Sequence, residues 1–298
     1  MLFGYSFLSS FTLYLIFNTI METTPVIYQW HLDISIAILT LFIVFMYYKI
    51  GGLRQQKKVV WFWLAIFLFL FMECSPMHFL GMHYYFSAHM ITHVVLLLIC
   101  GPLLVLSIPN KNVSPKPAAL QIFSSVIYKY PLLAWLAGVG IMWFWHIPAI
   151  FDASFTAMNN HFSAIPALHA GSMLLAGILL AWPLFGPFKN YHIHPLAGIV
   201  YLFTACISCS LLGLLITFAP LNTFHYYTNL NKLMSMKGTN PWALTLKSDQ
   251  QAAGLIMWVP CCFVYLTGCI YLLQQWFAGN DNSTQNIQKL NPSMINHE

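Results

Sequence analysis

The sequence predicts an all-α protein, a polytopic membrane helix bundle of about seven transmembrane helices. Hydrophobic residues make up 59% of the 298-residue chain and charged residues only 6%. Soluble domains carry about 25% charged residues, so this chain has too few charges to build a water-exposed surface. Its apolar segments are unbroken and do not alternate with polar residues, which favours helices over a β-barrel.

Seven apolar segments are the candidate spans, because a helix needs roughly 20 mainly apolar residues to cross the hydrocarbon core. They are residues 34–48, 59–73, 88–108, 131–145, 165–185, 195–218 and 251–273. Several of these segments end at Trp, Tyr or Pro, which is typical of membrane interfaces and of helix ends. We therefore expect one membrane domain over residues 31–276.

The two ends of the chain differ from this domain. Residues 1–30 form an apolar N-terminal extension without the basic residues of a secretory signal. An uncleaved eighth helix, a signal-like segment and an interfacial helix are all compatible with it. Residues 277–298 are rich in Asn, Ser and Gln, which predicts a polar, disordered cytoplasmic tail.

The basic residues predict the orientation of the bundle. With seven spans, nine of the twelve Lys and Arg residues fall on one side, and only Lys232, Lys237 and Lys247 on the other. Cytoplasmic loops carry the excess of basic residues, so the seven-helix core should begin outside and end inside. The net charge of +5 comes from scattered loop residues and forms no patch, so nucleic acid is not an expected partner, whereas the lipid bilayer is.

The histidines gather on the predicted outer side of the membrane. Nine of the twelve lie outside or in the outer part of a helix: His31, His78, His83, His89, His93, His146, His161, His169 and His225. A single histidine is most simply solvated or satisfied by the backbone. Polar residues within a membrane are costly and tend to mark functional sites, so the grouping is what indicates a site.

The spacing of these histidines predicts a metal site. His89 and His93 are four residues apart and therefore lie on one face of a helix. His146 ends the fourth span, and His161 and His169 begin the fifth, so three successive helices bring histidines to a similar depth. The candidate ligands are His89, His93, His146, His161, His169, Met90, His78 and His83.

The methionines indicate which metal to expect. Eight of them share the outer side: Met77, Met82, Met90, Met142, Met158, Met173, Met234 and Met236. Thioether and imidazole ligands together favour copper, particularly Cu(I). Because membrane helices also use Met for packing, this argument depends on the shared location.

Acidic residues and cysteines complete the candidate site. Glu73, Asp33 and Asp249 lie near the outer ends of spans. A carboxylate there can orient a ligand histidine or simply reach water, and Glu73 and Asp249 are the candidates to hydrogen-bond to a ligand histidine. Cys74 stays a possible ligand. The remaining cysteines are expected to pack as small residues, including the C-x-x-C in the middle of an apolar helix: Cys100, Cys206, Cys209, Cys261, Cys262 and Cys269.

No motif of an enzyme is present. The sequence lacks a Gly-rich phosphate loop, an H-E-x-x-H and a G-x-S-x-G. We therefore expect a protein that is not an enzyme.

Four stretches resemble the multi-pass CtaG family of bacterial cytochrome c oxidase assembly factors, which is distinct from the single-span copper chaperone of the same name. They are FSAHMITH at 86–93 with GPLL at 101–104, WHIP at 145–148, His161 and His169 with AWPL at 181–184, and DQQAAGLIMW at 249–258. The resemblance extends from about residue 30 to residue 276. The N-terminal extension and the outer loop at 222–248 depart from the family.

The resemblance implies a seven-span protein of the bacterial inner (cytoplasmic) membrane that is needed to mature haem–copper oxidase. It also implies that the protein handles copper outside the membrane. Cytochrome c oxidase subunits and periplasmic copper chaperones are the candidate partners.

Two other functions fit a membrane bundle with clustered histidines. A membrane cytochrome with bis-His haem ligation should place its axial histidines at two depths, whereas these histidines lie at one level. A cation transporter should show ionisable groups near the midplane or broken helices, and the midplane here is apolar apart from Cys and Thr.

Overall fold

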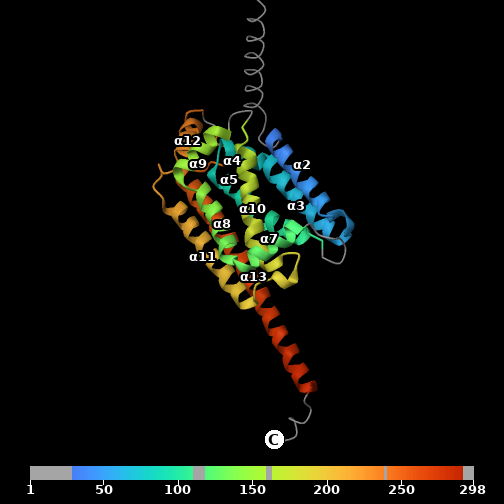
Figure 1. Cartoon of the computed structure of the whole chain (residues 1–298). Helices are drawn as coiled ribbons and strands as arrows, with labels where there is room; N and C mark the ends of the chain where they lie inside the picture. Colours follow the sequence, from blue (N-terminus) through green and yellow to red (C-terminus); the bar gives the residue numbers. More distant parts are fainter. Residues whose placement is uncertain (1–28, 110–117, 159–162, 238–239, 291–298) are drawn as a thin grey trace, which may run out of the picture.

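The computed structural model describes the chain except residues 1–28, 110–117, 159–162, 238–239 and 291–298 (Figure 1). The described residues contain helices and no strand, which confirms the predicted all-α class. The N-terminal extension therefore falls almost wholly outside the described residues.

The first half of the chain folds into a series of helices, one of which contains a π-helical segment. In order these are α2 (Ile34–Lys49), η2 (Gly52–Arg54), α3 (Gln56–Cys74), α4 (Pro76–His83), α5 (Phe86–Val95), the π-helical η3 (Leu96–Cys100) and α6 (Gly101–Ser107). α5, η3 and α6 together form one continuous span, Phe86–Ser107.

The second half contains the longest helices. They are α7 (Ala118–Lys129), α8 (Pro131–Trp145), α9 (Pro148–Met158), α10 (Ile165–Phe185), η4 (Lys189–Tyr191), α11 (Pro195–Phe218), α12 (His225–Lys237) and α13 (Leu246–Leu290). Proline stands in the first turn of α4, α8, α10 and α11. Its fixed φ suits that position and its missing N–H costs no bond there, so these prolines help to set where the helices begin.

Several helices are long and apolar enough to cross a membrane. Four spans meet the requirement alone. Two bent pairs of helices, α3 with α4 and α7 with α8, raise the number to six if each pair is one span. α2 has only 16 residues, fewer than the roughly 20 that a span needs. A multi-span membrane protein is thus confirmed, and seven spans stay a prediction.

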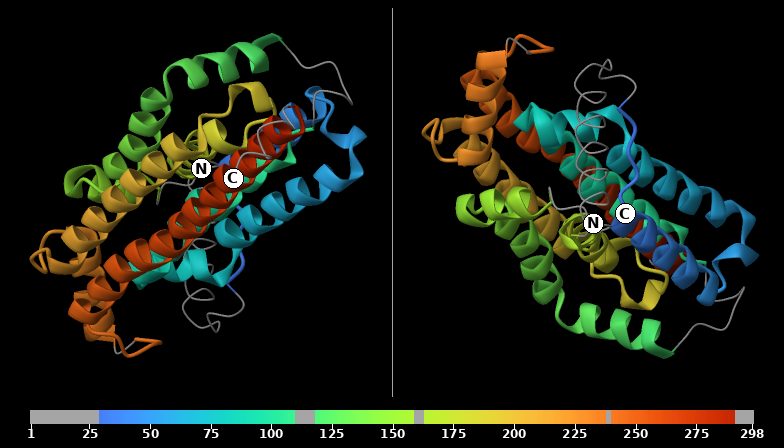
Figure 2. Two further views of the ribbon diagram at one scale, coloured as in Figure 1. Left: turned by 90° about the horizontal axis from the view of Figure 1, so that it is seen from below. Right: turned by 90° about the horizontal axis from the view of Figure 1, so that it is seen from above.

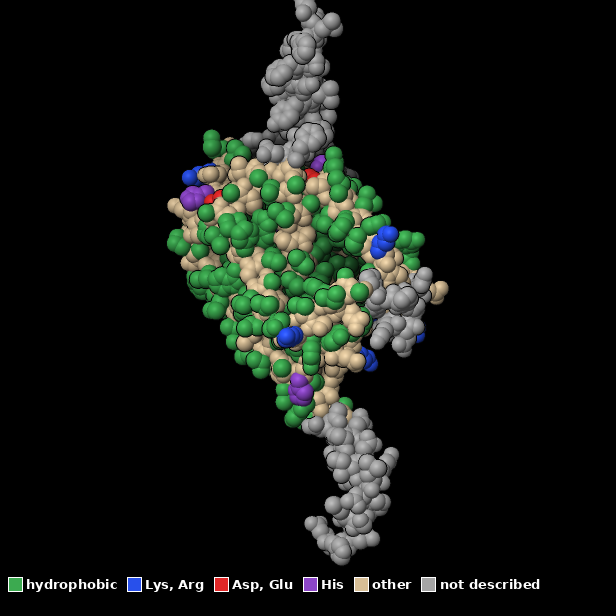
Figure 3. Space-filling model, in the orientation of Figure 1, with side chains coloured by type: hydrophobic (Ala, Val, Ile, Leu, Met, Phe, Trp, Pro, Cys, Tyr) green, Lys and Arg blue, Asp and Glu red, His purple; other side chains and the backbone are tan. Residues whose placement is uncertain are grey.

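The outward surface of the bundle suits lipid. Leu41, Phe67, Phe203 and Phe263 each expose between 60% and 69% of their surface. Apolar side chains cover most of the visible face of the bundle, where charged ones are few (Figure 3). In water such a surface would drive association, whereas in a bilayer it is the expected solvent boundary.

Three shorter helices gather at one end of the bundle. α4, α9 and α12 lie at the upper end in Figure 1, above the central helices α5 and α10. All three come from segments that the sequence places outside the membrane. α12 lies within the outer loop at 222–248, for which the sequence did not predict a helix.

The last helix is longer than the sequence predicts. The sequence placed a disordered tail at 277–298, but the backbone of α13 continues as a helix to Leu290. No proline interrupts the chain between Pro260 and Pro292, so nothing in the covalent backbone stops the helix at Trp276. Figure 2 shows α13 running beside α11, against which it packs most extensively.

Candidate metal centre

Three buried histidines converge at the upper end of the bundle. His89 and His93 of α5 and His169 of α10 each offer a ring nitrogen within 4.8 Å of the others. Their ring centroids are 4.3 Å apart for His89 and His93, 5.4 Å for His89 and His169, and 4.6 Å for His93 and His169. We call these residues the histidine trio. Metal–imidazole bonds of about 2.0–2.1 Å would require only small ring movements to close the trio round an ion.

Three of the four ring nitrogens of the α5 pair make no hydrogen bond within the protein. His89 Nε2 and both ring nitrogens of His93 are buried without a hydrogen bond, and they make up three of the five such atoms in the described part of the chain. A buried polar atom left unsatisfied costs about 1–3 kcal/mol, and proteins rarely tolerate several together. An ion bound by the trio would take one nitrogen from each histidine and so satisfy two of these three atoms, which fits the donor set to a metal.

Glycines bring the two helices of the trio together. Gly101 and Gly177 lie two turns from His93 and His169 respectively, on the faces that meet. A Cβ on Gly101 would lie 2.7 Å from Gly177 Cα, and a Cβ on Gly177 would collide with the carbonyl oxygen of Leu97. Small residues allow membrane helices to approach this closely, and the approach places His93 against His169.

A π-helical segment follows directly after the pair of histidines on α5. Leu96–Cys100 adopts this rare geometry between His93 and Gly101. Such segments are frequent at functional sites, and they rotate the side chains that follow. Here the segment lets one continuous helix present His93 and Gly101 to the same neighbour.

His146 and Met90 form a second pair of donors beside the trio. The ring of His146 lies 5.1 Å from that of His93, and its Nε2 is 3.4 Å from Met90 Sδ. Its Nδ1 is 2.6 Å from the carbonyl oxygen of Met142. Because a carbonyl only accepts, Nδ1 carries the proton, and the lone pair of Nε2 faces the thioether.

Asp249 positions the helix that carries the pair. Its carboxylate accepts hydrogen bonds from the backbone N–H groups of Phe86 (2.7 Å) and Ser87 (3.1 Å) and from the hydroxyl of Ser87 (2.5 Å). The N-terminus of a helix presents unpaired N–H groups and partial positive charge, both of which a carboxylate satisfies. Asp249 of α13 therefore caps α5, and this contact is with the helix and not with a histidine.

Other predicted site residues are not among the three histidines whose ring nitrogens converge. On α4, the Nδ1 of His78 is 3.5 Å from Glu73 Oε2, and the ring of His83 packs 4.6 Å from that of Phe79. Cys74 is a half-buried free thiol. His161 lies outside the described residues.

Aromatic side chains of α9 and α12 cover the trio. The rings of Phe155 and Phe151 lie 4.7 Å and 5.9 Å from that of His89, and Tyr226 packs 4.5 Å from Phe155. The hydroxyl of Tyr227 donates to the carbonyl of Gly81, and burial raises the pKa of this tyrosine well above its usual value. Nothing in the sequence marks this aromatic cover, because a Phe or Tyr in a predicted loop carries no signal of what it will cover.

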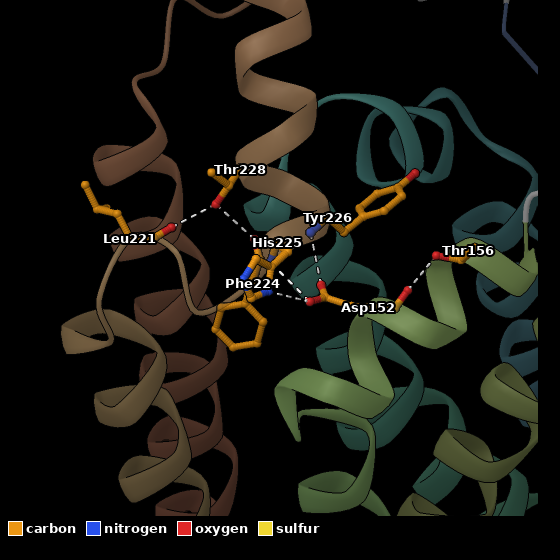
Figure 4. Close-up of polar contacts among 7 residues, drawn as sticks. All are labelled: Asp152, Thr156, Leu221, Phe224, His225, Tyr226 and Thr228. Carbon is orange, nitrogen blue, oxygen red and sulfur yellow. Dashed lines mark hydrogen bonds and ion pairs between the residues drawn. The ribbon is translucent and has the colours of Figure 1, made fainter.

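Asp152 joins α9 to α12, the two helices whose aromatic side chains cover the trio (Figure 4). From α9 it accepts hydrogen bonds from the backbone N–H groups of His225 (3.2 Å) and Tyr226 (3.0 Å) at the start of α12. The same carboxylate lies 3.2 Å from His225 Nδ1. We call these contacts the clasp. The contacts with His225 are exposed, whereas the three side chains of the trio are buried.

Comparison with known proteins identifies the family. A family model described as cytochrome c oxidase caa3 assembly factor (Caa3_CtaG) matches residues 38–279, which include the trio, the His146–Met90 pair, Asp152 and Asp249. Comparisons with curated proteins and with solved structures gave no match. Since the family model covers most of the sequence, the chain belongs to the cytochrome c oxidase caa3 assembly factors.

Proposed function

We propose that this membrane protein assists assembly of haem–copper cytochrome c oxidase by binding Cu(I) at the histidine trio and passing it on at the outer face. The observation that carries the proposal is the convergence of three buried histidines, with three ring nitrogens of His89 and His93 left without a hydrogen bond. A packed core would satisfy or avoid these atoms. A site kept ready for an ion explains why they are retained.

The donor set favours Cu(I) over harder cations. The trio contributes only imidazoles, and the neighbouring pair adds an imidazole and the thioether of Met90. Soft thioether and imidazole donors suit Cu(I), whereas Mg²⁺ and Ca²⁺ prefer oxygen. All of these ligands are neutral, so the bound ion adds a single positive charge to a buried site, half the charge of Zn²⁺.

The arrangement of donors also supports transfer. His93 contacts both His169 and His146, so an ion at the trio can exchange ligands with the His146–Met90 pair without leaving the protein. In the orientation that the basic residues predict, the trio faces the outside of a bacterial inner membrane. Periplasmic copper chaperones would supply the ion there, and oxidase subunits would receive it.

The geometry argues against a bis-His haem at this place. The rings of His89 and His93 have centroids 4.3 Å apart, and His93 lies 4.6 Å from His169. A haem would have to pass its macrocycle between two axial rings, and these rings are in contact with each other.

Copper binding to the purified full-length protein tests the proposal. Under reducing conditions, competition with a Cu(I) chelator should show loss of one ion per chain in the His89→Ala/His93→Ala double variant and in His169→Gln. His83→Ala is the matched control, because His83 is exposed and lies outside the trio. Equal copper content and equal nitrogen coordination in all four proteins would contradict the proposal.

A further inference from the structure

A group of sulfur atoms meets inside the bundle, away from the histidine trio. The Sδ of Met142 on α8 is 3.4 Å from the Sγ of Cys209 on α11, and Cys261 on α13 is buried in the same hydrophobic cluster. Their exposed fractions are 0%, 1% and 0% respectively. We call Met142, Cys209 and Cys261 the sulfur cluster. A second thiol pair lies beside it, with Cys206 Sγ 3.6 Å from Cys262 Sγ.

The close packing of α11 and α13 brings these thiols together. Gly213 lies one turn after Cys209, and Gly254 two turns before Cys261, so each glycine shares a face with a cysteine of the cluster. A Cβ on Gly213 would lie 2.7 Å from the carbonyl oxygen of Gly254. Close approach explains why small residues are needed here. Ala or Ser would meet that need equally well, so packing alone does not explain a convergence of sulfur.

The sulfur cluster connects with the histidine site. Met142 precedes His146 by one turn, and its carbonyl oxygen accepts the hydrogen bond from His146 Nδ1. His146 Nε2 in turn faces Met90 of α5. Soft donors therefore follow one another from the trio, through His146 and Met90, to Met142 and Cys209.

We propose that the sulfur cluster is a second Cu(I) site, with Met142, Cys209 and Cys261 as its ligands. The inference extends the proposed copper handling and takes its metal from that proposal. When Cu(I) binds, one cysteine thiol loses its proton to solvent and a Cu–S bond forms, with no change of oxidation state. One positive charge replaces another, so the net charge of this apolar interior stays unchanged and the burial cost of an isolated ion is avoided.

A tyrosine hydroxyl is placed to stabilise the thiolate. Tyr265 Oη lies 4.0 Å from Cys209 Sγ and is buried on the same helix as Cys261. As a thiol, Cys209 is the donor towards this oxygen. Once the thiol has lost its proton, the hydroxyl can donate to the sulfur, and hydrogen bonds to a charged acceptor are the stronger kind.

The test is copper binding by the full-length protein in detergent, with X-ray absorption to identify the ligand atoms. Wild type should bind two Cu(I) ions, one coordinated mainly by nitrogen and one mainly by sulfur. Cys209→Ser with Cys261→Ser should lose the sulfur-coordinated ion alone. Cys100→Ser is the matched control, since Cys100 is equally buried but packs in a different cluster, against Ile36 and Phe69.

Two further variants separate the possible results. Met142→Leu keeps the size of the side chain and should weaken Cu(I) binding at this site at least about 10-fold. This variant tests the sulfur-coordinated site if the double cysteine variant does not fold. Two ions in the double cysteine variant, or unchanged affinity and sulfur coordination in Met142→Leu, would overturn the inference. His89→Ala/His93→Ala should keep the sulfur-coordinated ion. If that variant keeps both ions while the cysteine variant loses one, the sulfur site stands and the function proposed for the trio fails.

Discussion

Adding one methyl group to Gly177 should open the histidine trio without touching a histidine. A Cβ at this position would collide with the carbonyl oxygen of Leu97 and lie 3.1 Å from Gly101 Cα. Both obstacles are backbone atoms, so no side chain can turn aside and α10 must move away from α6. An ordinary contact needs roughly 1 Å more room than the structure provides, since well-packed heavy atoms lie about 3.5–4.0 Å apart.

The effect of Gly177→Ala can be estimated from two opposing contributions. Ala is favoured over Gly in a helix interior by about 1 kcal/mol, whereas overpacking a core costs about 1–3 kcal/mol. The net change in the free energy of unfolding is therefore a loss of about 0–2 kcal/mol. Because His169 lies two turns away on the same face, its distance from His93 should increase, and Cu(I) affinity should fall by about 10–100-fold, as it does when the support of a metal ligand is lost.

Gly140→Ala is the matched control for this experiment. A Cβ at Gly140 of α8 meets nothing within 4 Å, so only the gain in helix propensity applies. Thermal unfolding and Cu(I) competition on the two purified variants give the comparison. If Gly177→Ala binds Cu(I) as tightly as Gly140→Ala, the close approach of α6 and α10 does not set the geometry of the trio.

Three further predictions follow from the contacts around the trio and from the charge distribution. Asp249→Ala removes the carboxylate that caps α5. In thermal unfolding it should lower the stability of the protein by about 1–2 kcal/mol, and it should weaken Cu(I) binding. The nearby Gln250→Ala should leave the cap of α5 intact. Asp152→Ala opens the clasp and should speed the release of Cu(I) to a chelator in stopped-flow measurements, with binding stoichiometry unchanged; equal release rates would show that α12 does not control access. Reporter fusions after residue 275 and within 111–129 should read as cytoplasmic and one within 239–246 as external, and an inverted pattern would place the trio on the cytoplasmic side.

The spans could be predicted from the sequence because the bilayer imposes a simple rule on them. A lipid-exposed backbone must satisfy its own hydrogen bonds, so each long apolar segment folds into a helix. The bends were harder to predict. α3 and α4 meet at an angle of 42° at Ser75, and α7 and α8 at 94° at Tyr130. A proline follows each bend, and Pro marks a helix start without stating the angle at which the two helices meet.

The candidate site was predictable in part. The spacing of His89 and His93 puts both on one helix face, and the position of His169 at the start of its span puts it at the same depth. His78 and His83 share that depth in the sequence, but they lie on α4, which follows a bend of 42°, and their nitrogens are not among those that converge. The contact of Met90 with His146, and those of Asp249 with α5, depend on how distant helices pack. No local pattern in the sequence contains that information.

Cytochrome oxidase activity in cells tests the central claim most directly. The double variant His89→Ala/His93→Ala should be expressed in place of the wild-type protein, with its abundance in the membrane confirmed and His83→Ala as the control. If the trio supplies copper to the oxidase, activity should fall in low-copper medium at normal abundance, and added copper should restore part of it. Full oxidase activity of the double variant in low-copper medium would contradict the account.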